Sequence, residues 1–217
     1  MKFKAKENLN LRDTPSINGK KIGTIKKDSI VESDEYTWKK VTLKDGAEGF
    51  CASEFLEEAP EPKWHIPIRE DKFIVTQKFL NPDKETYPKT GCHPGVDYGT
   101  QGEKNVPLYF CADGEVIESK TEHKFFGNSF FYYVEEVDKT FVYFHLKNAP
   151  PEKGKYKAGE KCGVAGDTGL SEGIHLHLEC IEGKVTSTKR AELFTSKESL
   201  KENAKDADKF IKERLDE

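Results

Sequence analysis

Two histidines separated by a single residue carry the clearest chemical signal in this sequence. They lie in the segment Gly173-Ile174-His175-Leu176-His177-Leu178-Glu179. Residues two apart on a strand share a face, so we expect His175 and His177 to point to the same side. Leu176 and Leu178 then face the core. Two neutral imidazoles side by side would repel each other on protonation, which indicates a cation site or a catalytic site.

A second segment offers an imidazole and a carboxylate around a Pro-Gly turn. His93 and Asp97 form the pattern H-x-x-x-D in Gly91–Tyr98, a spacing that is common by chance. Cys92 stands beside His93, but the neighbouring groups already complete a site, so we do not expect it to bind a metal. Catalytic zinc takes three protein ligands from His, Asp, Glu or Cys and leaves its fourth position to water.

A third segment, Tyr143-Phe144-His145-Leu146, adds another histidine. Strand parity predicts that Tyr143 and His145 share one face, with Val142, Phe144 and Leu146 on the other. Any one of these histidines alone is readily explained as a hydrogen-bonded core residue. Their number, spacing and order together indicate a zinc site, with more candidate groups than the metal needs.

The elements that must position these groups are short strands. From Lys4 to Glu58 the strands are brief and separated by turns, which is typical of a small β-barrel. Asn8-Leu9-Asn10-Leu11-Arg12, Trp38-Lys39-Lys40-Val41 and Gly49-Phe50 resemble the motifs of bacterial SH3-like domains, with Phe50 in place of the more usual Trp. We therefore expect such a domain over residues 1–59, either as a cell-wall targeting module or as a simple stabilising barrel.

A proline-rich stretch predicts a linker at residues 60–72, because prolines favour stiff, extended backbone. We expect His65 within it to be a surface residue. Strands resume over residues 73–194, and a mainly antiparallel sheet is the natural interpretation. Residues 195–217 then show helical spacing, with Leu200, Ala204, Ala207, Ile211 and Leu215 on one face. Thr195-Ser196-Lys197-Glu198 has the form of a capping box, so we expect one amphipathic C-terminal helix.

The order H-x-x-x-D, Tyr-x-His-Leu and His-x-His resembles the lysostaphin-type (LytM-type) peptidoglycan endopeptidases. Val164–Ser171 is similar to that family's approach to its His-x-His strand. The resemblance implies a mainly β fold: an SH3-like barrel, an antiparallel β-sheet metallopeptidase domain and a C-terminal α-helix. It also implies that Zn²⁺ is bound by the metal ligands His93, Asp97 and His177. His145 and His175 would flank the water that zinc activates, as catalytic residues.

The resemblance implies a zinc endopeptidase that cuts peptide cross-links or stem peptides of bacterial peptidoglycan, as in phage-type lysins. The alternatives are a non-catalytic wall-binding or hydrolase-regulating protein, and a zinc peptidase with another protein substrate. Family members cut either glycine bridges or bonds between D-alanine and a diamino acid. Asn81–Thr90 resembles a local insertion, which affects the substrate groove. His123 lies in an expected loop, where histidines are usually solvated.

The amino-acid composition excludes several other classes of protein function. The net charge of −4 gives no footprint for nucleic acid, and we expect a monomer without a membrane span. Five cysteines without a Cys-x-x-Cys pair make a disulfide framework improbable, so we interpret them as small core residues. The N-terminus shows no secretory signal. We therefore expect synthesis in the cytoplasm with action on the cell wall, or a trimmed secreted chain.

Overall fold

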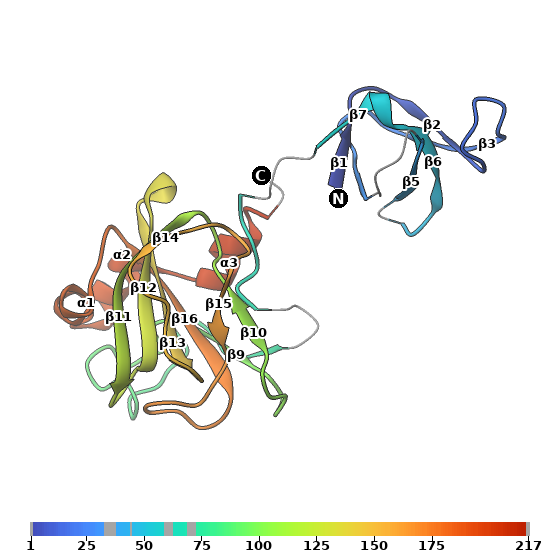
Figure 1. Cartoon of the computed structure of the whole chain (residues 1–217). Coiled ribbons are helices and arrows are strands. Elements are labelled where there is room, and N and C mark those ends of the chain that lie inside the picture. The colour runs from blue at the N-terminus through green and yellow to red at the C-terminus, as the bar shows by residue number, and fades with distance from the viewer. Residues whose placement is uncertain (1, 33–37, 44, 59–62, 69–72, 216–217) are drawn as a thin grey trace. The chain divides into compact units, whose positions relative to one another are not determined.

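The structure is a computed structural model that describes residues 2–32, 38–43, 45–58, 63–68 and 73–215. The chain divides into two units, Met1–Glu61 and Pro62–Glu217 (Figure 1). Strands predominate in both units, which confirms the mainly β fold class. Within the described ranges, no helix is long and apolar enough to cross a membrane.

The first unit is a single antiparallel sheet folded around a small core. Its elements are β1 (Lys2–Ala5), β2 (Leu9–Arg12), β3 (Lys21–Ile25), β4 (Ile30–Glu32), β5 (Trp38–Thr42), β6 (Glu48–Ala52), the 3-10 turn η1 (Ser53–Phe55) and β7 (Leu56–Glu58). The strands are ordered β3-β2-β6-β5-β4-β1-β7. Leu9 and Leu11 alternate with polar neighbours, and both are buried with Ile25 and Val41. The alternation expected from the sequence therefore builds this core.

The second unit is built on a larger antiparallel sheet, ordered β14-β11-β12-β13-β16-β9-β8. Its strands are β8 (Ile74–Gln77), β9 (Val96–Gly99), β11 (Gly114–His123), β12 (Gly127–Val134), β13 (Lys139–Leu146), β14 (Gly154–Tyr156) and β16 (His175–Glu182). β10 (Pro107–Tyr109) and β15 (Lys161–Val164) form a separate pair, and the 3-10 turn η3 (Glu135–Val137) joins β12 to β13. Figure 1 shows β11, β12, β13 and β16 side by side in this unit.

The two faces of the large sheet are both buried, against different partners. One face carries the main core, which includes Phe130, Tyr143 and Leu178. The other face carries a smaller core that includes Phe144 and Phe194. On that second side lie α1 (Ser187–Leu193) and α2 (Lys197–Asn203). Because neighbouring residues of a strand point to opposite faces, β13 and β16 supply both cores at once.

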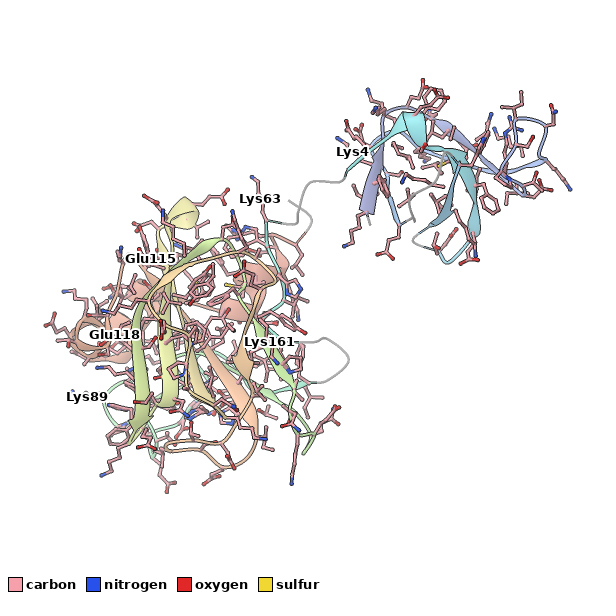
Figure 2. The ribbon with its side chains drawn as sticks, viewed as in Figure 1. Lys4, Lys63, Lys89, Glu115, Glu118 and Lys161 are labelled. Carbon is pink, nitrogen blue, oxygen red and sulfur yellow. The ribbon has the colours of Figure 1, made fainter. Side chains whose placement is uncertain are left out.

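Helix α1 is attached to the sheet through a carboxylate on β11. Glu118 accepts hydrogen bonds from the backbone nitrogen of Ser187, at 2.6 Å, and from its hydroxyl, at 3.0 Å. Figure 2 labels Glu118 on β11, the strand beside α1. A carboxylate at a helix N-terminus satisfies free N–H groups there, so this contact sets where α1 begins.

The linker expected at residues 60–72 is wrong in part, because its apolar residues belong to the second unit. Trp64 is 2% exposed, forms a bridge with Ala112 and packs its ring against Phe141. Ile68 is fully buried and bridges Leu108. Burial of large apolar side chains against the sheet overrides the expectation of a free segment. Residues 59–62 and 69–72 lie outside the described part.

The single C-terminal helix expected at residues 195–217 is also wrong. In its place are α2, the short strand β17 (Ala204–Lys205) and α3 (Ala207–Lys212). β17 pairs with β16 at Cys180 and Ile181, beyond the end of its pairing with β9. Backbone groups left unpaired at a buried strand are costly, so pairing with β16 interrupts the helix. Asp206 then caps α3, and Ser196, not Thr195, caps α2. Residues 216–217 lie outside the described part.

All five cysteines are buried as free thiols, which confirms their interpretation as small core residues. Cys92 lies in the smaller core of the sheet with its sulfur 3.5 Å from the carbonyl oxygen of Thr90. It contributes no atom to the cluster of metal-ligating groups described below. The expectation that Cys92 is not a ligand agrees with this placement.

Candidate metal centre

Three side chains from two distant segments converge at one end of the large sheet. Asp97 on β9 stands directly opposite His177 on β16 in the strand register. His177 Nδ1 lies 2.7 Å from Asp97 Oδ1, and His93 Nε2 lies 3.0 Å from His177 Nδ1 and 3.2 Å from Asp97 Oδ1. The three groups predicted as metal ligands are therefore together in space.

The loop between β8 and β9 brings His93 to this cluster. Its backbone N–H donates to the Asn81 carbonyl, and its own carbonyl accepts from the Leu80 N–H, so the loop closes on itself. Gly95 then passes against β16. A Cβ at that position would lie 2.4 Å from the carbonyl oxygen of Leu178, closer than any real contact. The turn thus requires glycine to bring His93 beside His177.

Neighbouring acceptors determine which ring nitrogen of each histidine faces the cluster. His93 Nδ1 lies 3.2 Å from the Lys78 carbonyl oxygen, which can only accept, so this nitrogen carries the proton. His177 Nε2 lies 3.1 Å from Glu179 Oε1 in the same way. His93 Nε2 and His177 Nδ1 are therefore the ring nitrogens directed at the cluster, where Nδ1 of His177 lies 2.7 Å from Asp97 Oδ1 and would release its proton to a bound metal. Such partners fix the tautomer and orientation of histidines that bind metals.

Glu179 is itself held by a buried arginine from α1. Arg190 donates from Nε to Oε2 at 2.6 Å and from Nη2 to Oε1 at 2.5 Å, and Glu179 is fully buried. Neither residue was predicted to belong to the site. Strand parity places Glu179 on the face of His175 and His177, which is the signal that the sequence did offer. No sequence signal points to Arg190, because it lies on a separate helix.

A row of aromatic rings supports the same histidine from its face. Phe144 stacks on His177 with ring centroids 5.0 Å apart and planes 9° apart, and Phe126 stacks on Phe144 at 4.4 Å. His123, expected to be a solvated loop residue, continues the row by stacking on Phe126 at 4.3 Å. The Arg190 guanidinium lies 5.3 Å from the Phe126 ring and 5.6 Å from the Phe144 ring. His177 is therefore held both at its edge and on its face.

The cluster perturbs the ionisation of its members. Burial opposes the charged form of His177, but Asp97 and then Glu179 outweigh it and raise the pKa of His177 to about 9. Burial opposes ionisation of Asp97, yet His177 and His93 hold its pKa well below the ordinary range. Burial likewise opposes the Glu179 carboxylate, and Arg190 lowers its pKa to about 2. Two carboxylates thus stabilise positive charge at this point.

The donor set fits a zinc ion. Zinc binds imidazole nitrogen and carboxylate oxygen at roughly 2.0–2.2 Å in tetrahedral geometry, which separates neighbouring ligand atoms by ~3.3 Å. The three atoms here are 2.7, 3.0 and 3.2 Å apart. Two imidazoles and one carboxylate also form the ligand type that catalytic zinc uses, with one position left for water.

Strand parity gave the wrong face for His145, because β13 contains a bulge. Asn128 pairs with Leu146 and Phe130 with Tyr143, so Phe144 and His145 stand opposite the single residue Ser129. His145 adopts a left-handed backbone with φ of 63°. The extra residue turns both side chains to the metal-centre side, where the ring of His145 lies 4.7 Å from that of His175. Tyr143 is instead fully buried in the main core.

His145 and His175 have matching tautomers. Nδ1 of His145 lies 2.8 Å from the Thr168 carbonyl oxygen, and Nδ1 of His175 lies 2.8 Å from that of Gly173. Both Nδ1 atoms therefore carry protons, and both Nε2 atoms are free to accept one. His175 Nε2 is 3.9 Å from Asp97 Oδ1. Burial, followed by the charge of His177, lowers the pKa of His145 to about 4, which keeps it neutral near pH 7.

An apolar groove adjoins His145 and encloses about 580 Å³. The insertion expected at Asn81–Thr90 supplies one wall, the turn between β11 and β12 supplies another, and α1 supplies a third. His145 lies in its lining. The second unit thus combines a metal-ligand cluster, a pair of acid–base groups and an adjacent groove.

Comparisons with known proteins agree with both halves of the chain. Residues 7–57 match the bacterial SH3 domain family. The peptidoglycan DD-endopeptidase ShyB of Vibrio cholerae is 35% identical over 136 residues, which are 60% of this chain and 30% of ShyB. Its relative ShyA from the same organism is 31% identical over 125 residues, 56% of this chain and 26% of ShyA. The chain is thus similar in sequence to two peptidoglycan DD-endopeptidases, which supports its resemblance to the lysostaphin-type family.

The fold is also similar to that of a solved lysostaphin domain. The catalytic domain of the antimicrobial peptidase lysostaphin from Staphylococcus simulans superposes with a TM-score of 0.51 at 20% identity. The match covers 64% of this chain and 92% of the lysostaphin domain. The chain spans less than a third of the length of the two Vibrio relatives.

Proposed function

We propose that this chain is a zinc-dependent endopeptidase that cuts peptide cross-links or stem peptides of bacterial peptidoglycan. The convergence of three ligand atoms within 3.2 Å of one another, beside two imidazoles with free Nε2 atoms, carries the proposal. The substrate class is supported by the two relatives named as peptidoglycan DD-endopeptidases. The clustered histidines by themselves suggest only a metal-dependent reaction. The activity of the two relatives supports peptidoglycan as the substrate.

His93, Asp97 and His177 hold the metal in this proposal. A bound zinc ion would acidify a water molecule toward a pKa of ~7 and polarise the carbonyl of the bond to be cut. The chain's own contribution is to direct His93 Nε2 and His177 Nδ1 at one point. The Lys78 backbone carbonyl and the Glu179 carboxylate do so by accepting hydrogen bonds from the opposite ring nitrogens.

His145 and His175 carry the proton transfers. Each presents a free Nε2 beside the cluster, and each ring is fixed by a carbonyl on its other nitrogen. One ring takes a proton from the attacking water, and once protonated it can donate to the departing amine. The groups are largely buried, so little reorganisation accompanies the transfer.

The SH3 domain serves as a wall-binding module in the same proposal. A hollow of about 450 Å³ on this unit is lined by polar and aromatic side chains that include Asn8, Asn10, Trp38 and Phe55. Such a surface suits a peptide with small side chains. The amide side chains can form hydrogen bonds with its peptide groups, and the aromatic rings can pack over its backbone. Binding of the isolated unit to purified cell walls, and its loss in Trp38→Ala, would test this assignment.

The metal is tested by its amount and by its dependence on the proposed ligands. The purified chain should hold about one zinc per molecule, and Asp97→Ala should lose it. His145→Ala should retain zinc and abolish turnover, whereas His65→Ala, a histidine outside the cluster, should retain both. Normal activity in His145→Ala would refute the proton-transfer role.

The substrate is tested by digesting purified peptidoglycans that differ in their cross-links, with mass spectrometry of the released fragments. New amine and carboxyl ends within the peptide cross-links or stems are the expected products. Binding to cell walls without metal and without cleavage would favour a non-catalytic wall-binding or regulatory protein. Cleavage of unrelated proteins but of no peptidoglycan would favour a zinc peptidase with another substrate.

A further inference from the structure

The loop between β15 and β16 supplies an acceptor to each of the two histidines that carry the proposed proton transfers. The Thr168 carbonyl oxygen lies 2.8 Å from His145 Nδ1, and that of Gly173 lies 2.8 Å from His175 Nδ1. The loop is also bonded to the start of β16, because the His175 N–H donates to the Gly166 carbonyl oxygen at 3.0 Å. One loop therefore orients a ring on β13 and a ring on β16.

Thr168 is bonded through its side chain to two strands of the large sheet. Its hydroxyl donates to the Leu146 carbonyl oxygen on β13 at 2.9 Å and accepts the backbone N–H of Asn128 on β12 at 2.9 Å. Asn128 and Leu146 stand opposite each other in the strand register. Opposed residues of an antiparallel pair can form hydrogen bonds directly with each other. Here the Thr168 hydroxyl bridges the two backbone groups instead.

This bridge coincides with the bulge that directs His145 to the metal centre. The irregularity of β13 begins at the pair of Asn128 and Leu146, and His145 is the residue before Leu146. Its left-handed backbone, with φ of 63°, is unfavourable for a residue with a side chain, so the surroundings must enforce it. A bulge also interrupts the ladder and leaves backbone groups to be satisfied elsewhere. The Thr168 hydroxyl satisfies one such group on each strand.

The Thr168 side chain is closely packed against the turn between β11 and β12. A Cβ at Gly127 would overlap both the hydroxyl and the carbonyl oxygen of Thr168, and a Cβ at Gly169 would overlap the Gly127 backbone. The Leu170 N–H donates to the Phe125 carbonyl oxygen at 3.1 Å, which joins the loop to this turn. The hydroxyl is therefore held at a fixed place between the two strands.

We propose that Thr168 is a positioning residue for His145. Its hydroxyl keeps the bulge of β13 open, which directs the His145 ring to the metal centre, and its carbonyl keeps the ring proton on Nδ1 and leaves Nε2 free. Without the hydroxyl, Asn128 and Leu146 can pair directly, so the bulge closes and the ring is displaced. This inference rests on the proposed function, in which His145 transfers protons, and deepens it.

The first test measures turnover of a soluble cross-linked peptide from peptidoglycan. Thr168→Val keeps the shape of threonine without its hydroxyl. It should lower kcat by roughly 10- to 100-fold, because a small displacement of a catalytic group has an effect of this size, with KM and zinc content unchanged. Thr168→Ser keeps the hydroxyl and should restore most of the activity.

Thr140→Val is the matched control. The Thr140 hydroxyl also lies on β13, where it donates to the Gly183 carbonyl oxygen at 2.7 Å and accepts the Val185 N–H at 2.9 Å. It thus bridges two backbone groups as Thr168 does, at the end of β13 away from His145. Thr140→Val should lower stability and leave kcat unchanged.

A second measurement reads the His145 ring without turnover. Nitrogen-15 NMR of the chain labelled at histidine distinguishes the two tautomers, and the His145 signals are those missing from His145→Gln. The wild type, Thr168→Ser and Thr140→Val should carry the proton on Nδ1. Thr168→Val should lose this preference, because the acceptor on Nδ1 determines which nitrogen is protonated.

The proposal is overturned if Thr168→Val keeps the wild-type kcat or the wild-type tautomer of His145, or if Thr168→Ser is as impaired as Thr168→Val. If Thr168→Val does not fold, Thr168→Ala removes the same hydroxyl and takes its place in both measurements. If the wild type cleaves no peptidoglycan peptide, the proposed function fails, and the tautomer comparison still decides whether Thr168 positions His145.

Discussion

Asp97 and His177 face each other across β9 and β16, with Oδ1 and Nδ1 2.7 Å apart. They are 80 residues apart in the sequence, and the pairing of these two strands brings them together. His93 joins them from the preceding turn. The antiparallel register thus builds the metal-ligand cluster, and the predictions below test the contacts that hold it.

The buried pair Glu179 and Arg190 should affect stability and metal binding in different ways. Arg190→Met leaves the buried Glu179 carboxylate without its guanidinium partner and should lower the free energy of unfolding by about 3–5 kcal/mol. Glu179→Gln should cost a similar amount and weaken zinc binding about 10-fold, because the charge that orients His177 is lost. Urea denaturation and chelator competition measure the two effects.

The double variant Glu179→Gln/Arg190→Met supplies the control for this pair. With both charges removed, much of the lost stability should return, while zinc binding stays weak. An Arg190→Met variant as stable as the wild type would show that the pair contributes nothing to folding. Zinc binding restored in the double variant would show that Glu179 does not orient His177.

Gly95→Ala should disturb the metal centre through the backbone. The added methyl group would lie 2.4 Å from the Leu178 carbonyl oxygen and 3.0 Å from His177 Nε2. We expect a loss of stability of about 1–3 kcal/mol from overpacking, together with weaker zinc binding as His93 is displaced. Gly23→Ala is the control, since its new methyl group meets only Leu11 side-chain atoms, at 3.5 Å or more. Equal effects of the two substitutions would argue against a positioning role for Gly95.

The stability of the zinc-free chain should fall as the pH rises from 6.5 to 8. His177 has a pKa of about 9 in the folded chain and ~6.5 when unfolded, so the folded state holds its proton more tightly. The resulting stabilisation is fully present below pH 6.5 and is lost as the pH rises through 9. At ~1.4 kcal/mol per unit, about 2 kcal/mol disappears by pH 8, before unfolded thiols titrate near ~8.5.

Zinc should cancel this dependence, because a metal-bound imidazole has no proton to lose. Zinc binding at pH 7 should also release a proton from His177, so affinity should increase with pH up to about 9. Calorimetry in two buffers of different ionisation enthalpy counts the protons released. Binding without proton release, or a zinc-free chain whose stability is flat over this range, would contradict the charged state of His177.

Trp64→Ala should destabilise the second unit and leave the first unchanged. Trp64 is 2% exposed and packs edge-on against Phe141 and Phe210. Truncating a buried tryptophan typically costs about 3–5 kcal/mol. Scanning calorimetry of the whole chain should show a lower transition temperature for one unit. Trp38→Ala, in the first unit, is the control and should move only the other transition. If the unfolding temperature of the second unit is unchanged in Trp64→Ala, Trp64 is part of the linker and not of the core of that unit.

Several features of the candidate site were predictable because they depend on local pattern. Alternation along one strand predicted that His175 and His177 share a face and that Leu176 and Leu178 point into the core, and the structure places them so. The spacing of His93 and Asp97 is common by chance, and it indicated a site only together with the other histidines. Such patterns are readable because strand geometry forces a period of two whatever the rest of the chain does.

Other features depended on the partners that each segment met. The bulge that directs His145 to the metal centre arises from the register between β12 and β13. This register cannot be read from the sequence of β13 alone. The C-terminal helical pattern was genuine, yet β16 had backbone groups to satisfy and drew Ala204 and Lys205 into a strand. Arg190 became part of the site only when α1 packed on the sheet. The sequence by itself determined the residue types, the strand faces and the family resemblance, whereas long-range pairing decided how the groups meet, because hydrogen-bond and charge satisfaction are properties of the whole fold.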